Sequence, residues 1–144
     1  MANKSLIINS DLPVSQKVTG LLFCVAQEKK VEFTRAIQHT NLSLQQLDLL
    51  HYLDFGPKEG LTVNDLKDRM LDETSNVSRS LNKLVEAGYV VKQRSDVDQR
   101  IVYIVITKEG RKAHKEADKA LLGAGLGLSE ADAKKLYSIL KKIE

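Results

Sequence analysis

Between residues 75 and 106, a helix with two sharply different faces is followed directly by two β-rich runs, and this order restricts the fold more than any other feature of the chain. The apolar residues of the helix recur at the spacing of one core-facing stripe, at Val77, Leu81, Leu84 and Val85. Gly88 supplies a stop for this helix. The runs 89–94 and 101–106 are rich in β-branched and aromatic residues, and the polar residues between them predict a β-hairpin.

Helical periodicity and start signals predict five other helices. Two of them begin with a capping box, in which a hydroxyl and the residue three positions later satisfy each other's backbone N–H groups, at Ser43–Gln46 and Thr62–Asp65. The helix before the hairpin can be capped by either Thr74 or Ser75. Three of the five helices outside the 75–87 region are expected at residues 14–37, 44–55 and 63–70. A fourth begins after a Thr107 cap and ends at the glycine-rich break at 123–127, and the last begins after a Ser129 cap. A helix, a short turn, a second helix and a hairpin make a winged helix-turn-helix, so the predicted fold is mainly α with a small β-hairpin.

The outer face of the helix before the hairpin has the chemistry of a surface that reads DNA. Small hydroxyl and amide side chains allow close approach to base edges and phosphates, and an arginine can pair bidentately with guanine. The candidate DNA-binding residues on this face are Ser75, Asn76, Ser78, Arg79, Asn82 and Lys83. Those of the hairpin are Lys92, Arg94 and Arg100. Asp96 and Asp98 at the hairpin tip are expected to hold an arginine side chain by charged hydrogen bonds.

Charge is concentrated on the same stretch of the chain. The whole chain has a net charge of +3, which is too small by itself to indicate a nucleic-acid partner. Between residues 79 and 112, eight Lys or Arg side chains minus four Asp or Glu side chains give +4, so the rest is close to neutral. A basic run can also be only a solvated face, and an amphipathic helix with a polar outside is the corresponding alternative for the helix.

Two other classes of function are less consistent with the sequence. An enzyme is not expected, because the chain has no glycine-rich phosphate loop and no nucleophile motif. A winged helix used only for protein contacts should expose aromatic or Leu side chains on its outer face, whereas this face carries Ser, Asn, Arg and Lys. No cofactor is expected. His39, His51 and His114 are interpreted as surface or helix-end residues and not as ligands of a metal.

Three stretches together resemble the MarR family of bacterial and archaeal regulators: residues 61–66, 75–90 and 98–107. The resemblance extends from about Val14 to Ile143. It implies a transcription regulator, commonly a repressor, with a recognition helix in the major groove of double-stranded DNA. It also implies that a wing arginine, here Arg100, enters the minor groove.

The resemblance further implies a dimer built from the first, fifth and sixth helices. On this basis 1–144 is a single MarR-like domain, with dimerisation helices at about 14–38 and 108–144 and a winged helix-turn-helix module at about 43–107. The residues themselves favour a homodimer, because the middle of the first helix is apolar all round and needs cover from more than one side. A two-fold dimer should bind an inverted repeat with half-sites about one helical turn apart.

Regulation by a small phenolic or apolar effector is the leading hypothesis, since the resemblance implies that many members release DNA when such a ligand or an oxidant acts near the dimerisation helices. The candidate ligand-binding residues, which combine polar tips with apolar walls, are Leu22, His51, Tyr52 and Phe55. A role in core packing is the alternative for these residues. A cysteine-based redox-sensing regulator is the other alternative, but Cys24 lies among apolar neighbours, where a thiolate is disfavoured.

The expected location is cytoplasmic. No window approaches the run of about 20 apolar residues that a membrane helix requires, so no membrane partner is expected. The beginning of the chain lacks the apolar segment of a secretory signal. With a single cysteine, Cys24, no disulfide within the chain can form, which agrees with a reducing compartment.

Overall fold

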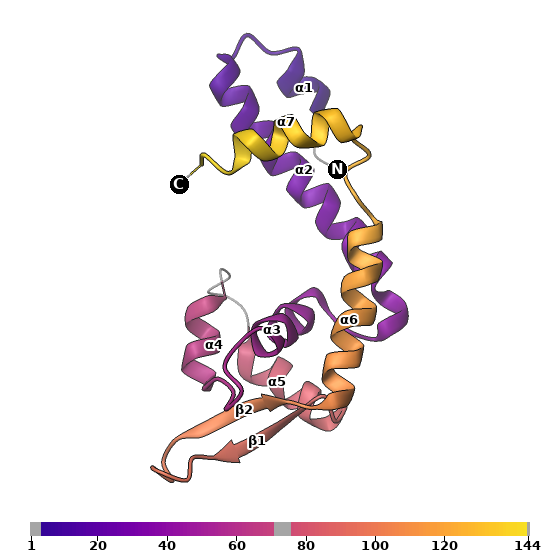
Figure 1. Cartoon of the computed structure of the whole chain (residues 1–144). Coiled ribbons are helices and arrows are strands. Elements are labelled where there is room, and N and C mark those ends of the chain that lie inside the picture. The colour runs from indigo at the N-terminus through magenta and orange to yellow at the C-terminus, as the bar shows by residue number, and fades with distance from the viewer. Residues whose placement is uncertain (1–3, 71–75, 144) are drawn as a thin grey trace.

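The computed structural model describes residues 4–70 and 76–143 of the chain (Figure 1). It is mainly helical with one two-stranded antiparallel hairpin. The elements in chain order are α1 (Lys4–Ile8), α2 (Val14–Ala36), the 3-10 helix η1 (Gln38–Thr40), α3 (Leu44–Asp54), α4 (Val63–Arg69), α5 (Val77–Glu86), β1 (Val90–Arg94), β2 (Val102–Ile106), α6 (Lys108–Gly123) and α7 (Glu130–Leu140). The sequence predicts all of these except α1 and η1.

Both predicted capping boxes are present. Ser43 accepts a hydrogen bond from the backbone of Gln46 at 3.1 Å, and the side chain of Gln46 accepts one from the backbone of Ser43 at 2.9 Å. Thr62 and Asp65 form the equivalent pair at the start of α4. Hydrogen bonds from the Thr62 hydroxyl and backbone lower the pKa of Asp65. Local sequence therefore decides where α3 and α4 begin.

The start of α5 differs from the prediction. Asn76 caps the helix, and its side-chain oxygen accepts a hydrogen bond from the backbone N–H of Arg79 at 3.0 Å. The alternative caps, Thr74 and Ser75, lie outside the described residues, as does the predicted DNA contact of Ser75. Asn76 can take this position because an Asn side chain accepts as readily as Ser or Thr from the free N–H groups of a first turn.

The hydrophobic core lies in the lower part of the molecule, in a region called here the core module (residues 37–117). Its buried cluster extends from Ile37 through α3, α4, α5 and the hairpin to Ala117 on α6. On α5, Val77, Leu81 and Leu84 are buried as predicted, but the expectation that Val85 faces the core is wrong, since it is 37% exposed. The buried stripe turns instead toward Ser80, whose hydroxyl donates to the side-chain oxygen of Gln45 on α3 at 2.6 Å.

The hairpin has the predicted arrangement and is attached to the helices at two places. Its register pairs Val90 with Ile106 and Arg94 with Val102. Leu61 forms two backbone hydrogen bonds with Ile104, at 3.1 and 2.7 Å, which joins the segment before α4 to β2. At the other end a side chain on Gly110 would meet the carbonyl oxygen of Tyr89, so only glycine allows α6 to approach the turn before β1 this closely.

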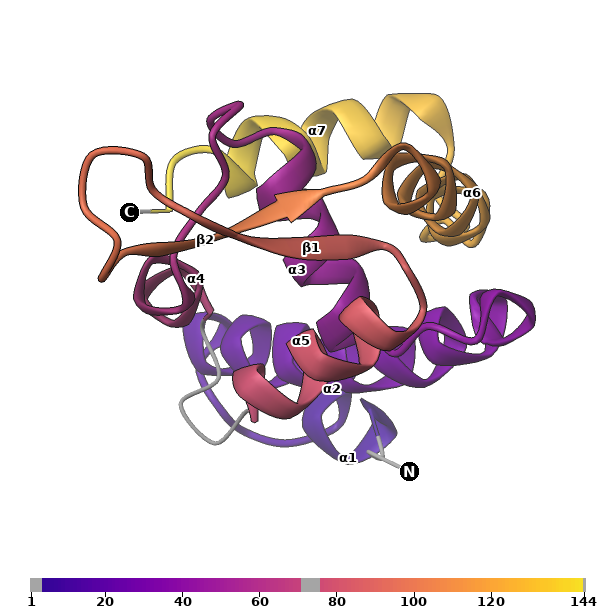
Figure 2. The ribbon, with the colours of Figure 1, turned by 90° about the horizontal axis from the view of Figure 1, so that it is seen from below.

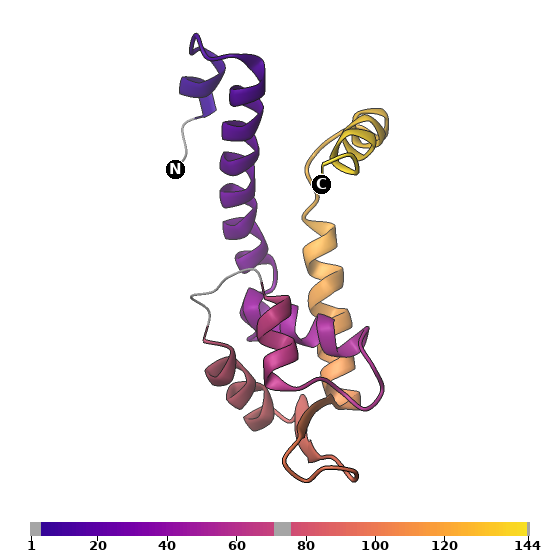
Figure 3. The ribbon, with the colours of Figure 1, turned by 90° about the vertical axis from the view of Figure 1, so that its left-hand side faces the viewer.

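Helix α2 extends upward, away from the core module, and α1 and α7 lie near its upper part (Figures 1 and 3). Lys29 on α2 donates to the carbonyl of Gly125, in the segment between α6 and α7, at 2.9 Å. Helices α1 and α7 have no buried residue, and α2 has one, Cys24. These three helices, called the upper helices below, thus expose most of their apolar side chains. Figure 2, viewed from below, shows the hairpin and α5 at the opposite end.

Candidate nucleic-acid interface

Helix α5 presents a polar face built from the residues between its buried positions. Ser78, Arg79, Asn82 and Lys83 are exposed, while Val77 and its stripe are buried. The cap places Asn76 at the head of this face, although its side-chain oxygen is already engaged by Arg79. Among the described residues, the guanidinium of Arg79 and the ammonium of Lys83 have no ion-pair partner, so both remain available for phosphates or base edges.

The first turn of α3 lies beside this face, which the sequence does not predict. A hollow of about 250 Å³ separates the two helices, and Ser43 and Gln45 line it together with Arg79 and Lys83. The hydrogen bond between Ser80 and Gln45 fixes α5 against α3 across 35 residues of sequence. A capping box at Ser43 indicates that a helix starts there, but nothing in the sequence indicates which helix it faces.

The hairpin supplies the second group of cations. Lys92 on β1 donates to the side-chain oxygen of Asn82 at 3.4 Å, which connects the wing with the face of α5. Arg94 is held by the backbone carbonyl of Gln99 at 2.8 Å. The side chain of Arg100 forms no hydrogen bond or ion pair with any of the described residues and lies in the exposed loop between the strands.

The predicted role of the two acids at the tip is wrong. Asp98 accepts a hydrogen bond from the backbone N–H of Arg100 at 3.0 Å, which shapes the turn. Within 76–143, neither Asp96 nor Asp98 forms an ion pair with an arginine. The reason is local: an Asp two residues before a backbone N–H closes a tight turn with less ordering of side chains than an Asp–Arg pair would require.

The candidate effector residues are only partly brought together. His51 on α3 and Phe55 at the C-cap of this helix have ring centroids 4.8 Å apart. The Tyr52 hydroxyl instead donates to the carbonyl of Arg69 at 3.0 Å. Leu22 lies on α2 and lines a different hollow, of about 450 Å³, with Leu126 and other residues of the upper end. None of the described residues that line this hollow with Leu22 belongs to α3.

His114 is buried, so its interpretation as a surface or helix-end residue is wrong. Its Nδ1 lies 2.8 Å from an oxygen of Asp54, its Nε2 lies 3.3 Å from Nδ1 of His51, and Arg111 pairs with the same carboxylate. Burial raises the pKa of Asp54, but hydrogen bonds from His114 and Arg111 outweigh it, and the pKa lies below its ordinary value. This cluster joins α3 to α6. In the part of the chain that the structure describes, no group of three or more His, Cys, Asp or Glu side chains is arranged to hold a metal ion.

Two further titratable side chains are Asp48 on α3 and Cys24 on α2. Burial raises the pKa of Asp48 on α3, and the nearby His51 opposes this effect. Cys24 is 7% exposed, so the prediction that its thiol is buried is confirmed. Its reactivity stays a prediction, as does the absence of a redox role.

The MarR family model matches residues 40–101, the region from η1 to the hairpin loop. Over this region the chain is similar to the MarR family. It is 26% identical to the HTH-type transcriptional regulator BilQ of Clostridium symbiosum over 115 residues, which cover 74% of this chain and 76% of BilQ. The resemblance to this family and the winged helix-turn-helix predicted from the sequence are confirmed.

Solved structures agree with the fold. MarR of E. coli in its apo form superposes with a TM-score of 0.76 at 19% identity, covering 93% of this chain and 98% of that one. CouR of Rhodococcus jostii RHA1, bound to p-coumaroyl-CoA, superposes with a TM-score of 0.74 at 21% identity, covering 92% and 95%. Like the regulators of the matching family, which are not enzymes, this chain is a DNA-binding transcription regulator with a winged helix-turn-helix fold. Within the described ranges no helix is both long and apolar enough to span a membrane.

Proposed function

We propose that this regulator binds double-stranded DNA sequence-specifically as a homodimer, with α5 in the major groove and the hairpin at the minor groove. The observation that carries the proposal is the continuity of two exposed basic elements: Lys92 of the wing is hydrogen-bonded to Asn82 of α5. A protein-interaction surface would require exposed aromatic or Leu side chains on α5, and the exposed positions are Ser78, Arg79, Asn82 and Lys83 instead.

Each candidate residue has a distinct part in this proposal. Arg79 and Asn82 read base edges, since Arg pairs with guanine and Asn with adenine in the major groove. Ser75, Asn76, Ser78 and Lys83 contact phosphates near the start and along the side of α5. Lys92 and Arg94 contact the backbone, and Arg100 enters the minor groove. The module of about 43–107 contains all of these residues.

The dimer is proposed from the upper helices. Phe23 is 67% exposed on α2, and Tyr137 and Ile139 on α7 are 68% and 59% exposed. Such a concentration of exposed apolar side chains marks an interaction surface, and a second copy of the chain is the partner that the family suggests. Helices within about 14–38 and 108–144 then provide the interface, and the two copies of α5 face an inverted repeat.

An effector is proposed between the dimerisation helices and the DNA-binding module, where α3 meets α6. His51 and Phe55 are both exposed there, beside the buried His114, and Leu22 lines a different hollow. CouR, which shares the fold, is described in complex with p-coumaroyl-CoA, and this supports a small-molecule ligand for the present chain. Repression that is relieved by such a ligand is the regulatory mode we propose.

Selection of bound sequences from a random duplex pool tests the DNA proposal, followed by titration of selected and unrelated duplexes. Arg79→Ala and Asn82→Ala are each expected to reduce the preference for the selected site by about 1–3 kcal/mol, because each removes a base contact. Lys108→Ala, on the first turn of α6, provides a control in which a cation is removed away from α5. If the α5 variants weaken binding to both duplexes equally, Arg79 and Asn82 contact only phosphates.

A further inference from the structure

Gln45 on α3 is a polar side chain at the edge of the proposed interface, and none of the contacts proposed above uses it. Its side-chain oxygen accepts the 2.6 Å hydrogen bond from the hydroxyl of Ser80, which is only 9% exposed on α5. An amide whose oxygen is engaged in this way presents its NH2 group on the opposite side. Ser80 therefore determines which way the two N–H donors of Gln45 point.

The NH2 group of Gln45 is available to a partner from outside the chain. It forms no hydrogen bond with any residue in 4–70 or 76–143. Among the described residues, no buried side-chain nitrogen or oxygen lacks a partner, so this unpaired NH2 group is in contact with solvent. The fold requires no ligand at this position, but the group can donate to an acceptor that enters the hollow between α3 and α5.

The hollow of about 250 Å³ beside Gln45 is positively charged. Arg79 and Lys83 line it, and neither has an ion-pair partner among the described residues. Its described lining contains no Asp or Glu. Two cations and a neutral donor around one small space match an oxyanion. The oxyanion that α5 meets in the proposed function is a phosphate of the DNA backbone.

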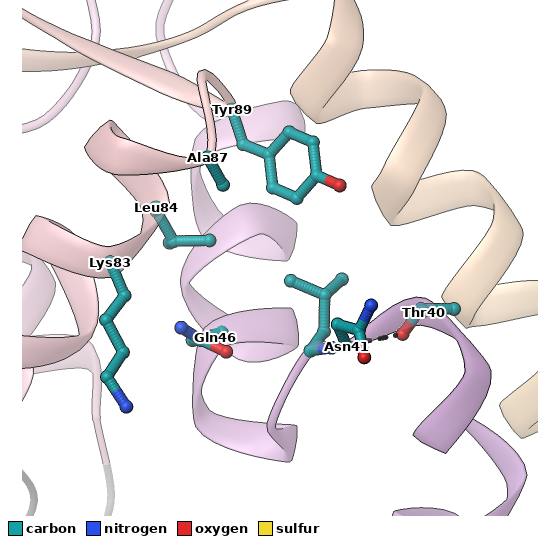
Figure 4. A pocket seen from close by; sticks show the side chains of 8 residues that line it. Thr40, Asn41, Gln46, Lys83, Leu84, Ala87 and Tyr89 are labelled. Atoms are coloured by element: carbon teal, nitrogen blue, oxygen red, sulfur yellow. Dashed lines mark hydrogen bonds between the residues drawn. The ribbon is translucent and has the colours of Figure 1, made fainter.

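A larger cavity of about 460 Å³ shares Gln46 and Lys83 with this hollow (Figure 4). The Lys83 side chain extends away from Tyr89, which lines the larger cavity and not the smaller hollow. Gln46 lines both, but its oxygen accepts from the backbone of Ser43 and so stabilises the start of α3. Of the two adjacent glutamines, Gln46 thus caps the helix and Gln45 lies against α5.

We propose that Gln45 is a DNA-contacting residue outside α5 and the wing, and that its NH2 group donates to one backbone phosphate in the hollow between α3 and α5. Ser80 is the positioning residue, since its hydroxyl holds the amide in the orientation that this contact requires. The contact rests on the proposed function and extends the interface to a third element, α3. Because Gln45 is neutral, it adds affinity for any sequence without neutralising a further phosphate charge.

Gln45→Met tests the contact, because methionine has a similar length and no hydrogen-bond donor. The Kd should rise about fivefold to tenfold on both the selected and an unrelated duplex, because one hydrogen bond is lost. The slope of log affinity against log salt should stay that of wild type. Gln38→Met makes the same change at an exposed position of η1 and should leave both Kd values unchanged. An unchanged Kd in Gln45→Met, or a loss confined to the selected duplex, would overturn the proposal.

A scan with methylphosphonates distinguishes a phosphate contact from packing. Each backbone phosphate of the selected duplex is replaced in turn by a methylphosphonate, which lacks the negative charge and one of the accepting oxygens. At one phosphate in each half-site, the difference in Kd between wild type and Gln45→Met should fall below about twofold, because the acceptor has already been removed. If Gln45 only packs α3 against α5, the full difference will remain at every position, and the proposed contact is wrong.

Ser80→Ala tests the positioning. Removal of the hydroxyl leaves the Gln45 amide free to rotate, so the Kd should rise about threefold, and this loss should depend on the same phosphate as that of Gln45→Met. The double variant should bind like Gln45→Met alone. Additive losses, or a loss in Ser80→Ala that is equal on every methylphosphonate duplex, would show that Ser80 does not act through Gln45.

Failure of the Gln45 contact and failure of the proposed function give different results. If wild type binds no duplex, both are wrong. If wild type binds the selected and the unrelated duplex with equal Kd, sequence-specific recognition is wrong, and Gln45→Met still decides the contact because a phosphate contact is independent of sequence. If wild type is specific and Gln45→Met binds equally well, only the contact of Gln45 is wrong.

Discussion

The core module and the upper helices differ in where their apolar side chains lie. In the core module most of the large apolar residues of α3, α4 and α5 are buried, and Leu49, Leu50 and Leu84 are fully inaccessible. The upper helices also contain large apolar side chains, yet α1 and α7 bury no residue and α2 buries only Cys24. One chain thus contains a unit with its own core and another whose burial must be completed by something else.

The largest expected effect is a difference in how much a substitution in each region lowers the free energy of unfolding. Leu49→Ala should destabilise the fold by about 2–5 kcal/mol, because it opens a cavity in the core module. Ile139→Ala, at a position 59% exposed, should cost under about 0.5 kcal/mol at the lowest protein concentrations, where a dimer dissociates. Pulse proteolysis in urea over a range of concentrations measures both. Equal losses in dilute solution would mean that the upper helices have a core of their own.

A charge in the upper helices should disrupt the dimer and leave the core module folded. Phe23→Asp is expected to weaken dimerisation by about 2–4 kcal/mol, because an aromatic side chain at an interface is replaced by an ion. Phe55→Asp is the matched control, since Phe55 is 74% exposed on the core module. Light scattering coupled to size-exclusion chromatography gives the masses. A Phe23→Asp dimer as tight as wild type would place the interface elsewhere.

The cluster around Asp54 connects α3 of the core module with α6, which leads to the upper helices. Asp54→Asn should destabilise the fold by about 1–3 kcal/mol at neutral pH, since His114 is buried and loses a charged acceptor. The pKa of Asp54 is lower in the folded state than its ordinary value of 3.8, so its contribution is present above that value. It is lost as the pH falls through the folded pKa.

Urea unfolding followed by circular dichroism at several pH values measures this dependence. The difference between wild type and Asp54→Asn should be largest near neutral pH and should become smaller below about pH 4. Asp96→Asn, at an exposed position of the hairpin tip, should match wild type within about 0.5 kcal/mol. A difference that grows as the medium becomes more acidic would contradict the assignment of the effect to the Asp54 carboxylate.

Features that depend on residues close together in the sequence are predictable from it, and features that depend on residues far apart are not. The starts of α3 and α4 and the paired strands depend on residues a few positions apart, such as Ser43 with Gln46, and all were predictable. The bonds of Ser80 to Gln45 and of His114 to Asp54 span 35 and 60 residues, and no local pattern encodes them. The first bond accompanies the burial of Ser80 where periodicity predicts Val85, and the second accompanies the burial of His114, which was expected at the surface or at a helix end.

The same distinction applies to the candidate site. A polar face on α5 and cations in the hairpin are readable because alternating burial leaves them outside. The approach of the first turn of α3 to Lys83 is a tertiary result, and so is the cavity beside it. The prediction that Asp96 and Asp98 hold an arginine side chain was wrong for another reason. The sequence shows that the charges are close along the chain, but not that the carboxylate of Asp98 accepts a hydrogen bond from a backbone N–H instead.

The smallest effect on stability is expected at the tip of the wing, where the core module meets solvent. Arg100→Ala should change the free energy of unfolding by no more than about 0.5 kcal/mol, because only the backbone N–H of Arg100 is engaged, by Asp98. Its effect on DNA should be larger. Narrow A·T-rich minor grooves attract a guanidinium. Loss of this cation leaves about one phosphate fewer neutralised per protomer, and the counterions of that phosphate are no longer released on binding.

Titration of wild type and Arg100→Ala on one selected duplex at several salt concentrations measures that loss. The slope of log affinity against log salt should flatten by about one unit per protomer, and the preference for A·T-rich flanks should decrease. Gln99→Ala, the neighbouring exposed position, leaves the charge unchanged and should keep the slope of wild type, since only its backbone carbonyl holds Arg94. An unchanged slope together with unchanged affinity in Arg100→Ala would remove this arginine from the interface and restrict DNA contact to α5 and the base of the hairpin.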